Sequence, residues 1–174
     1  MEWSGDCSGK VRCAVGMEKV TVGIAQGRVV SAGECLISYA LGSCVGVCLY
    51  DGVRRIAGMA HIILPGSRYA ARKDNPYKFA DEGIYALMEE MKCCGAVPGN
   101  ITAKIAGGAR MFGDNTDRWP VGEMNVEAVK QTLSLLGIPL IAGDTGGTHG
   151  RTILFYSENG KLEINTVRQK PFEL

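Results

Sequence analysis

Short apolar runs separated by glycine-containing or charged turns recur along most of the chain. Runs of this length that are rich in Val, Ile and Leu are typical of β-strands. They cover residues 19–25, 35–40, 45–50, 56–64, 101–106, 139–142, 151–156 and 161–165. Asp51-Gly52 lies between the third and fourth runs, and Asn159-Gly160 lies between the last two. Both dipeptides favour tight hairpin turns, so these neighbouring strands are expected to pair directly.

Two further segments repeat their apolar residues every three or four positions, as amphipathic helices do. The first covers residues 76–94, with Asp74 or Asn75 as its capping residue and Gly95 directly after its end. The second is expected to begin at Asn125, because asparagine is a favoured N-cap residue.

Several strands, two helices and no internal repeat predict a single α/β domain over residues 17–174. Residues 1–16 mix Gly, Ser, Cys and charged residues without periodicity. They are expected to form a loosely ordered N-terminal tail.

The charge of the chain is nearly balanced, with 19 basic and 18 acidic residues and a formal net charge of +1. The chain therefore has no overall positive field to hold nucleic acid. No apolar run is long enough to span a bilayer, and the N-terminus lacks the basic and apolar pattern of a secretory signal. We expect a cytoplasmic protein that neither binds nucleic acid nor inserts into membranes.

Cysteine and histidine usage narrows the candidate chemistry. The chain has seven cysteines, an odd number, and no Cys-X-X-Cys pair, which argues against a disulfide scaffold and a zinc ribbon. His61 and His149 are its two histidines, so a metal site with three histidines is excluded. Chemistry that needs a histidine must use one of these two.

Cys44 and His61 lie on successive predicted strands that the turn at residues 51–52 joins. In such a hairpin the start of one strand lies near the end of the other, so the two side chains are expected to meet. Gly42 and Gly46 flank Cys44 and let backbone N–H groups converge, as the oxyanion hole of an acyl-transfer site requires.

Two structural alternatives stand beside this catalytic interpretation. Cys44 can equally be a packed thiol like Cys48, and a lone histidine in an apolar strand is commonly a satisfied core residue. Ser38, on the preceding strand, is a candidate to accept a hydrogen bond from the imidazole of His61. A hydroxyl is a weaker orienting group than a carboxylate, because it carries no charge.

Two glycine pairs, Gly107-Gly108 and Gly146-Gly147, mark turns later in the chain. Neither segment has the spacing of a phosphate-binding loop or of a dinucleotide-binding fingerprint. We expect these tight turns to shape a substrate cleft, since glycine permits close backbone approach.

Several ordered motifs, taken together, carry a resemblance to a known family. The motifs are Leu41-Gly42-Ser43-Cys44-Val45, Gly58-Met59-Ala60-His61 with Leu64-Pro65, Lys104-Ile105-Ala106-Gly107-Gly108-Ala109 with Met111-Phe112, Asn125-Val126, and Asp144-Thr145-Gly146-Gly147. They resemble the chemoreceptor glutamine deamidase (CheD) family over about residues 18–165. The resemblance implies a CheD-like deamidase domain over residues 17–174. It also implies a layered α/β fold of mixed β-sheets with about two main helices packed outside, similar to glutamine-deamidating toxins.

By position, the resemblance implies that Cys44 is the nucleophile and His61 the base. The third residue falls on Ser38, where the family usually has a threonine. In the expected mechanism, backbone amides near Ser43 and Cys44 stabilise the oxyanion of a thioester-forming reaction, and no metal or cofactor is needed.

The resemblance further implies hydrolytic deamidation of glutamine to glutamate on the cytoplasmic helical domain of chemoreceptors, in chemotaxis adaptation. It also implies a complex with a CheC-type phosphatase. Two other functions stay open: another cysteine hydrolase that acts on esters or isopeptides, and a non-catalytic adaptor that stimulates a CheC-type response-regulator phosphatase.

Overall fold

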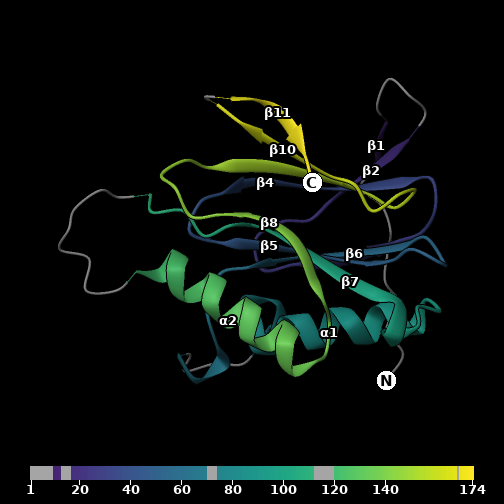
Figure 1. Cartoon of the computed structure of the whole chain (residues 1–174), viewed down its shortest axis with the longest axis horizontal. Coiled ribbons are helices and arrows are strands. Elements are labelled where there is room, and N and C mark those ends of the chain that lie inside the picture. Colours follow the sequence, from purple (N-terminus) through teal and green to yellow (C-terminus); the bar gives the residue numbers. More distant parts are fainter. Residues whose placement is uncertain (1–9, 13–16, 70–73, 112–119, 168) are drawn as a thin grey trace.

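The computed structural model describes residues 10–12, 17–69, 74–111, 120–167 and 169–174. The described chain forms three layers (Figure 1): a six-stranded sheet, a five-stranded sheet, and two helices that cover the outer face of the five-stranded sheet. Both sheets contain parallel and antiparallel neighbours. The predicted α/β class with mixed sheets and two outer helices is confirmed.

The six-stranded sheet combines strands from both ends of the chain. Its order is β1 (Lys10–Arg12), β2 (Glu18–Thr21), β4 (Glu34–Leu41), β9 (Arg151–Tyr156), β10 (Leu162–Thr166) and β11 (Gln169–Glu173). Strand β1 lies within the segment that was expected to be a loosely ordered tail, and it pairs antiparallel with β2.

The five-stranded sheet carries the predicted hairpin in its middle. Its order is β3 (Gly27–Val30), β6 (Ile56–Ile62), β5 (Val45–Asp51), β7 (Ile101–Gly107) and β8 (Leu140–Thr145). Asp51 pairs with Ile56 across a turn of four residues, and the predicted second hairpin joins β9 to β10. Both predicted hairpins are confirmed.

The helices are α1 (Ala80–Cys93) and α2 (Val121–Leu135), with short 3₁₀ turns at Ser67–Tyr69, Pro76–Lys78 and Pro98–Asn100. No helix in the described ranges has the length and apolar content that a membrane crossing requires. The first helix starts later than predicted, because Phe79 is extended and separates it from the preceding 3₁₀ turn. Asn75 caps that turn by accepting from the Tyr77 amide.

The second helix corrects the sequence interpretation more strongly. It begins at Val121, four residues before the predicted N-cap Asn125. Asn125 is fully buried inside the helix, where its side chain contacts other segments instead of capping the helix. Three strands, β1, β3 and β11, were not predicted, and all three lie at sheet edges.

Alternation along β5 and β6 divides the interior into two cores. Val45, Val47 and Leu49 point toward the helices, whereas Cys48 and Met59 point toward the six-stranded sheet. Cys44 packs with the second group, in the space between the two sheets. The period of two places His61 on the same face, since it lies two residues after Met59.

Candidate active site

The register of the central hairpin brings Cys44 close to His61. Gly46 pairs with His61 across the β5–β6 ladder, and Cys44 lies two residues before Gly46. Cys44 lies just before β5 begins, and continuing the ladder by one residue would place it diagonally across from His61, where regular sheets hold Cα atoms about 7–8 Å apart. Because the opposing residue is glycine, no side chain of β5 stands directly between the two.

His61 is held from the opposite sheet by Ser38. The Nδ1 atom of His61 lies 2.9 Å from the Ser38 hydroxyl oxygen, and that hydroxyl also donates to the Val22 carbonyl at 2.9 Å. A hydroxyl has one proton, so the Ser38 oxygen must accept from Nδ1–H of His61. This arrangement assigns the proton to Nδ1 and leaves Nε2 with a free lone pair.

Burial keeps both candidate groups neutral at rest. His61 is 1% exposed, and its Nε2 atom has no hydrogen-bond partner among the described residues, Cys44 included. Burial lowers the pKa of His61 to about 4, since removal from water penalises the imidazolium. Burial also raises the pKa of the Cys44 thiol, while its own backbone amide lowers it to a smaller extent. A neutral Nε2 can accept a proton during a reaction.

The loop that carries Cys44 is fixed by three carbonyl contacts. The Gly42 carbonyl accepts from the Ala109 amide at 2.8 Å, and the Cys44 carbonyl accepts from the Gly108 amide at 2.8 Å. Between them, the Ser43 carbonyl accepts from the side-chain amide of Asn125 at 2.9 Å. All three carbonyl groups therefore point into the body of the protein.

The amides of Ser43 and Cys44 are left available by this arrangement. Among the described residues, no backbone carbonyl accepts a hydrogen bond from the amide of Ser43 or of Cys44. Both residues are partly exposed. Free amide donors beside a thiol are the groups that an oxyanion hole needs.

The four predicted cleft glycines have different surroundings. A Cβ at Gly107 would lie 2.2 Å from the Cys44 carbonyl oxygen, and one at Gly108 would lie 2.3 Å from a methyl group of Val126. Both positions also have φ in the left-handed region. Gly107 and Gly108 thus permit close internal packing beside Cys44.

The second glycine pair lies against the first. The Gly146 amide donates to the Gly107 carbonyl at 2.9 Å, and the Gly147 carbonyl accepts from the Arg110 amide at 2.8 Å. A Cβ at Gly146 would meet nothing within 4 Å. The structure therefore brings both glycine turns to the Cys44 end of the sandwich, but their contact with a substrate stays a prediction.

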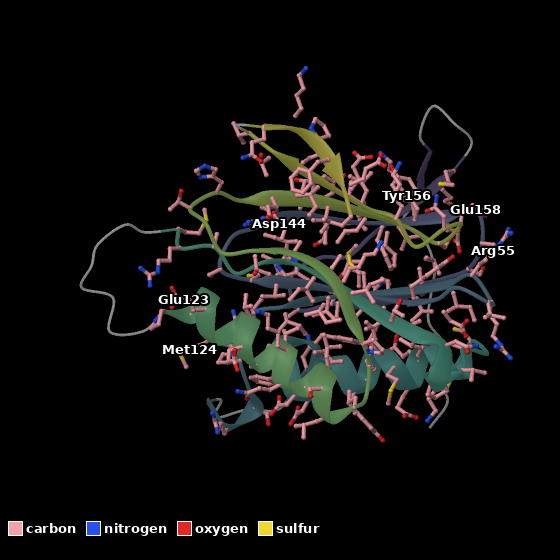
Figure 2. The ribbon with its side chains drawn as sticks, in the orientation of Figure 1. Arg55, Glu123, Met124, Asp144, Tyr156 and Glu158 are labelled. Carbon is pink, nitrogen blue, oxygen red and sulfur yellow. The ribbon has the colours of Figure 1, made fainter. Side chains whose placement is uncertain are left out.

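Sequence reasoning missed two polar residues at this end. Asn125 was interpreted as a helix cap, and only its place in a family-like motif singled it out. Arg151 is 7% exposed, pairs in register with Leu41, and forms an ion pair with Asp144 at 2.5 Å. In Figure 2, Asp144 lies near the middle of the view, whereas Arg55 and Glu158 lie at its right edge. The Asp144–Arg151 pair links the two sheets beside the Cys44 loop.

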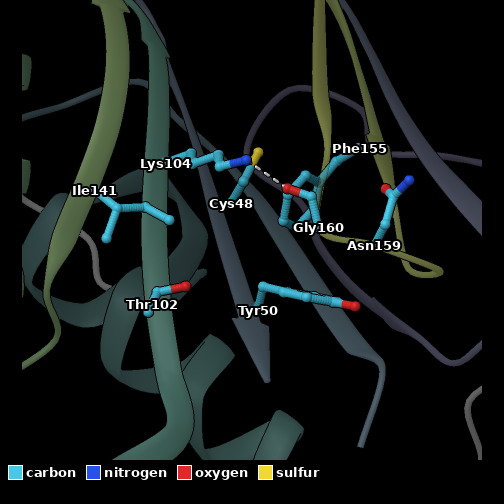
Figure 3. Close-up of a pocket in the computed structure, with 8 residues that line it drawn as sticks. All are labelled: Cys48, Tyr50, Thr102, Lys104, Ile141, Phe155, Asn159 and Gly160. Carbon is cyan, nitrogen blue, oxygen red and sulfur yellow. Dashed lines mark hydrogen bonds between the residues drawn. The ribbon is translucent and has the colours of Figure 1, made fainter. Parts of the chain in front are cut away.

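Two cavities lie away from Cys44 and His61. A cavity of about 80 Å³ is lined by Cys48 and Lys104, and Lys104 donates to the Gly160 carbonyl at 2.7 Å (Figure 3). A shallow groove of about 510 Å³ follows α2 past Glu123 and Met124. In the described part of the chain, no three His, Cys, Asp or Glu side chains gather as a metal site requires.

Comparison with known proteins identifies the family. A family described as CheD chemotactic sensory transduction matches residues 63–166. A protein of Caldanaerobacter subterraneus subsp. tengcongensis, named probable chemoreceptor glutamine deamidase CheD, is 48% identical over 84% of this chain and 91% of its own length. The chemoreceptor glutamine deamidase CheD of Halalkalibacterium halodurans is 44% identical over 89% of this chain and 98% of its own length.

A solved structure, the hypothetical protein YfiH of Bacillus licheniformis, matches 68% of this chain and 49% of its own with a TM-score of 0.44 and 20% identity. The fold and the site together define an α/β protein with a cysteine and a histidine on one inter-sheet face. The two relatives named chemoreceptor glutamine deamidases are 48% and 44% identical to this chain over 91% and 98% of their own lengths. The chain therefore belongs to the CheD family.

Proposed function

We propose that this chain hydrolyses the side-chain amide of specific glutamines on chemoreceptors, through a thioester on Cys44. The observation that carries the proposal is the hydrogen bond between Ser38 and His61, because it leaves Nε2 of His61 as a neutral base. Family membership supports the substrate, since the relatives are named chemoreceptor glutamine deamidases.

The first half of the reaction forms the thioester. Nε2 of His61 takes the proton of the Cys44 thiol, and the sulfur attacks the carboxamide carbon of glutamine. The amides of Ser43 and Cys44 donate to the oxygen as it gains negative charge. The imidazolium then gives its proton to the nitrogen, the C–N bond breaks, and ammonia leaves.

The second half releases glutamate. A water molecule gives a proton to Nε2 of His61 and attacks the thioester carbon, and the same amides hold the oxyanion. The C–S bond breaks, the sulfur regains a proton from the imidazolium, and the product is a glutamate side chain. Ser38 keeps Nδ1 protonated throughout, so that Nε2 is the nitrogen that moves protons.

The pKa shifts indicate how the pair operates. Because burial raises the pKa of Cys44 and lowers that of His61, a resting thiolate–imidazolium pair is disfavoured. Proton transfer is therefore coupled to attack on the carboxamide carbon.

The proposed setting is the cytoplasm, where the helical signalling domain of a chemoreceptor presents its glutamines. The family resemblance also proposes a CheC-type phosphatase as a second partner. Co-purification with such a phosphatase tests this partner separately, and its failure leaves the deamidase proposal intact.

Ammonia release from a purified receptor cytoplasmic fragment tests the proposed reaction. The wild-type protein should release ammonia, and Cys44→Ala should release none. Cys48→Ala is the matched control, because Cys48 lies on β5, four residues after Cys44 and packed in the same core, but is fully buried. Hydrolysis of a methyl ester or an isopeptide, without ammonia from glutamine, would instead identify another cysteine hydrolase.

A further inference from the structure

Asn125 connects the two segments that carry the candidate nucleophile and base. Its side chain is fully buried on α2, and its Nδ2 atom donates to two carbonyls. The Ser43 carbonyl lies 2.9 Å away and the Ile63 carbonyl 3.1 Å away. Ser43 directly precedes Cys44, and Ile63 lies two residues after His61. One amide group thus links the end of β6 to the loop of the candidate nucleophile.

The planarity of the peptide bond makes this contact relevant to chemistry. In a trans peptide, the carbonyl of one residue and the amide of the next point in opposite directions. When Asn125 holds the Ser43 carbonyl toward α2, the Cys44 amide must point away from α2. That amide belongs to the candidate nucleophile itself, so it lies beside the carbon that the sulfur would attack, where the carbonyl oxygen would gain charge.

The neighbouring supports of the loop are of a different kind. The carbonyls of Gly42 and Cys44 accept from backbone amides, which any sequence supplies. Of these three carbonyls, only that of Ser43 accepts from a side chain among the described residues, so its support depends on residue 125 being asparagine. Substitution at residue 125 can therefore free this one peptide group while both flanking contacts stay in place.

A purely structural role explains Asn125 less well. Its Oδ1 atom is buried and has no hydrogen-bond partner among the described residues. Burying an unpartnered oxygen costs free energy that an apolar side chain of similar shape would avoid. The two N–H donors of the side chain therefore explain asparagine at position 125 better than the space that the side chain fills.

We propose that Asn125 is a positioning residue for deamidation, which aims the Cys44 amide at the developing oxyanion by holding the Ser43 carbonyl. This inference rests on the proposed function and deepens it. It makes Asn125 act through the backbone of Cys44, without contact between its own side chain and the substrate.

Asn125→Ala tests the inference by removing both donors. The kcat for ammonia release should fall roughly 10–100-fold, since loss of an aligned oxyanion donor reduces kcat on this scale or more. KM should stay unchanged, because the lost interaction forms only in the transition state. Alkylation of Cys44 by iodoacetamide, located by peptide mass mapping, should keep its wild-type rate because that reaction forms no oxyanion.

The matched control is Val129→Ala, which removes a fully buried side chain one turn later on the same helix. It should loosen α2 but leave kcat unchanged. A wild-type kcat in Asn125→Ala would overturn the inference. So would parallel losses of kcat and Cys44 alkylation in both variants, since these indicate a loosened helix. Absence of ammonia release from the wild-type protein would instead refute the proposed function.

Asn125→Asp has nearly the same volume and provides a second test if the alanine variant does not fold. The protonated carboxyl group can donate one hydrogen bond, whereas the carboxylate can donate none and repels the two carbonyl oxygens. The ratio of its kcat to the wild-type kcat should therefore fall as the pH rises through the ionisation of the new carboxyl group. A ratio that is constant with pH would contradict the inference.

Discussion

The hydroxyl of Ser38 offers the sharpest test of how His61 is held. Ser38 and His61 are both buried, and the hydroxyl donates to Val22 while accepting from His61. Ser38→Ala removes both bonds and leaves the Val22 carbonyl and the Nδ1–H group without their partner. Loss of one partner of a buried hydrogen bond costs about 1–3 kcal/mol, so the free energy of unfolding should fall by at least this amount.

The effect on turnover should be smaller than the effect of losing the base itself. A neutral hydrogen bond contributes about 0.5–1.5 kcal/mol, which corresponds to a rate loss of roughly tenfold at most. The imidazole remains in place in Ser38→Ala, but its tautomer and orientation are no longer fixed. Ser38→Thr keeps the hydroxyl and should match or exceed the wild-type rate.

Ser157 provides a matched control for the stability loss. It is also a fully buried serine, and its hydroxyl donates to the Glu34 carbonyl at 2.6 Å and accepts from the Glu34 amide at 3.2 Å. Ser157→Ala should therefore lose stability on a similar scale without slowing ammonia release. Urea unfolding and receptor-fragment kinetics on the three variants separate the two effects. Wild-type kinetics in Ser38→Ala would remove Ser38 from the site and leave a Cys44–His61 dyad.

Further outcomes follow from the same geometry. Cys44→Ala should abolish deamidation with little change in thermal melting, because Cys44 is only partly buried at a loop; residual turnover would refute the mechanism. His61→Asn should slow turnover by roughly 10²–10⁴-fold, and kinetics should show His149→Ala near the wild-type rate. Since the pKa of His61 is lowered from 6.5 to about 4, the unfolded state binds its proton first as the pH falls. As the pH falls from 6.5 to about 4, the free energy of unfolding should therefore decrease by up to about 3 kcal/mol. Urea unfolding midpoints should show this decrease for the wild-type protein but not for His61→Asn. Gly107→Val should lose both receptor modification and Cys44 alkylation, because its side chain would overlap the Cys44 carbonyl; retention of alkylation alone would contradict this overlap.

The face that carries the candidate site follows from local sequence. Alternation along the hairpin, with glycine at position 46 opposite His61, places Cys44 and His61 on one side of the sheet. The dipeptide Asp51-Gly52 is a sufficient signal for the turn between the two strands. Neither inference requires knowledge of distant parts of the chain.

Contacts between layers are beyond such local rules. Ser38 and His61 are 23 residues apart and lie on different sheets. Local sequence offered Ser38 only as a candidate partner on the preceding strand, and the family resemblance supported it. Asn125 has the residue type of a helix cap, yet tertiary contacts to Ser43 and Ile63 determine its role. The edge strand β11 contains Pro171, which weakens a strand prediction because proline lacks an amide donor.

The most direct test of the central claim is peptide mass mapping of a receptor cytoplasmic fragment after incubation in heavy-oxygen water. Hydrolysis through a thioester predicts that specific glutamines become glutamates, each with one solvent oxygen in its new carboxylate. Cys44→Ala should produce no such change, and Cys48→Ala should reproduce the wild-type pattern. An unmodified fragment with the folded wild-type protein, or conversion that persists in Cys44→Ala, would contradict deamidation by Cys44.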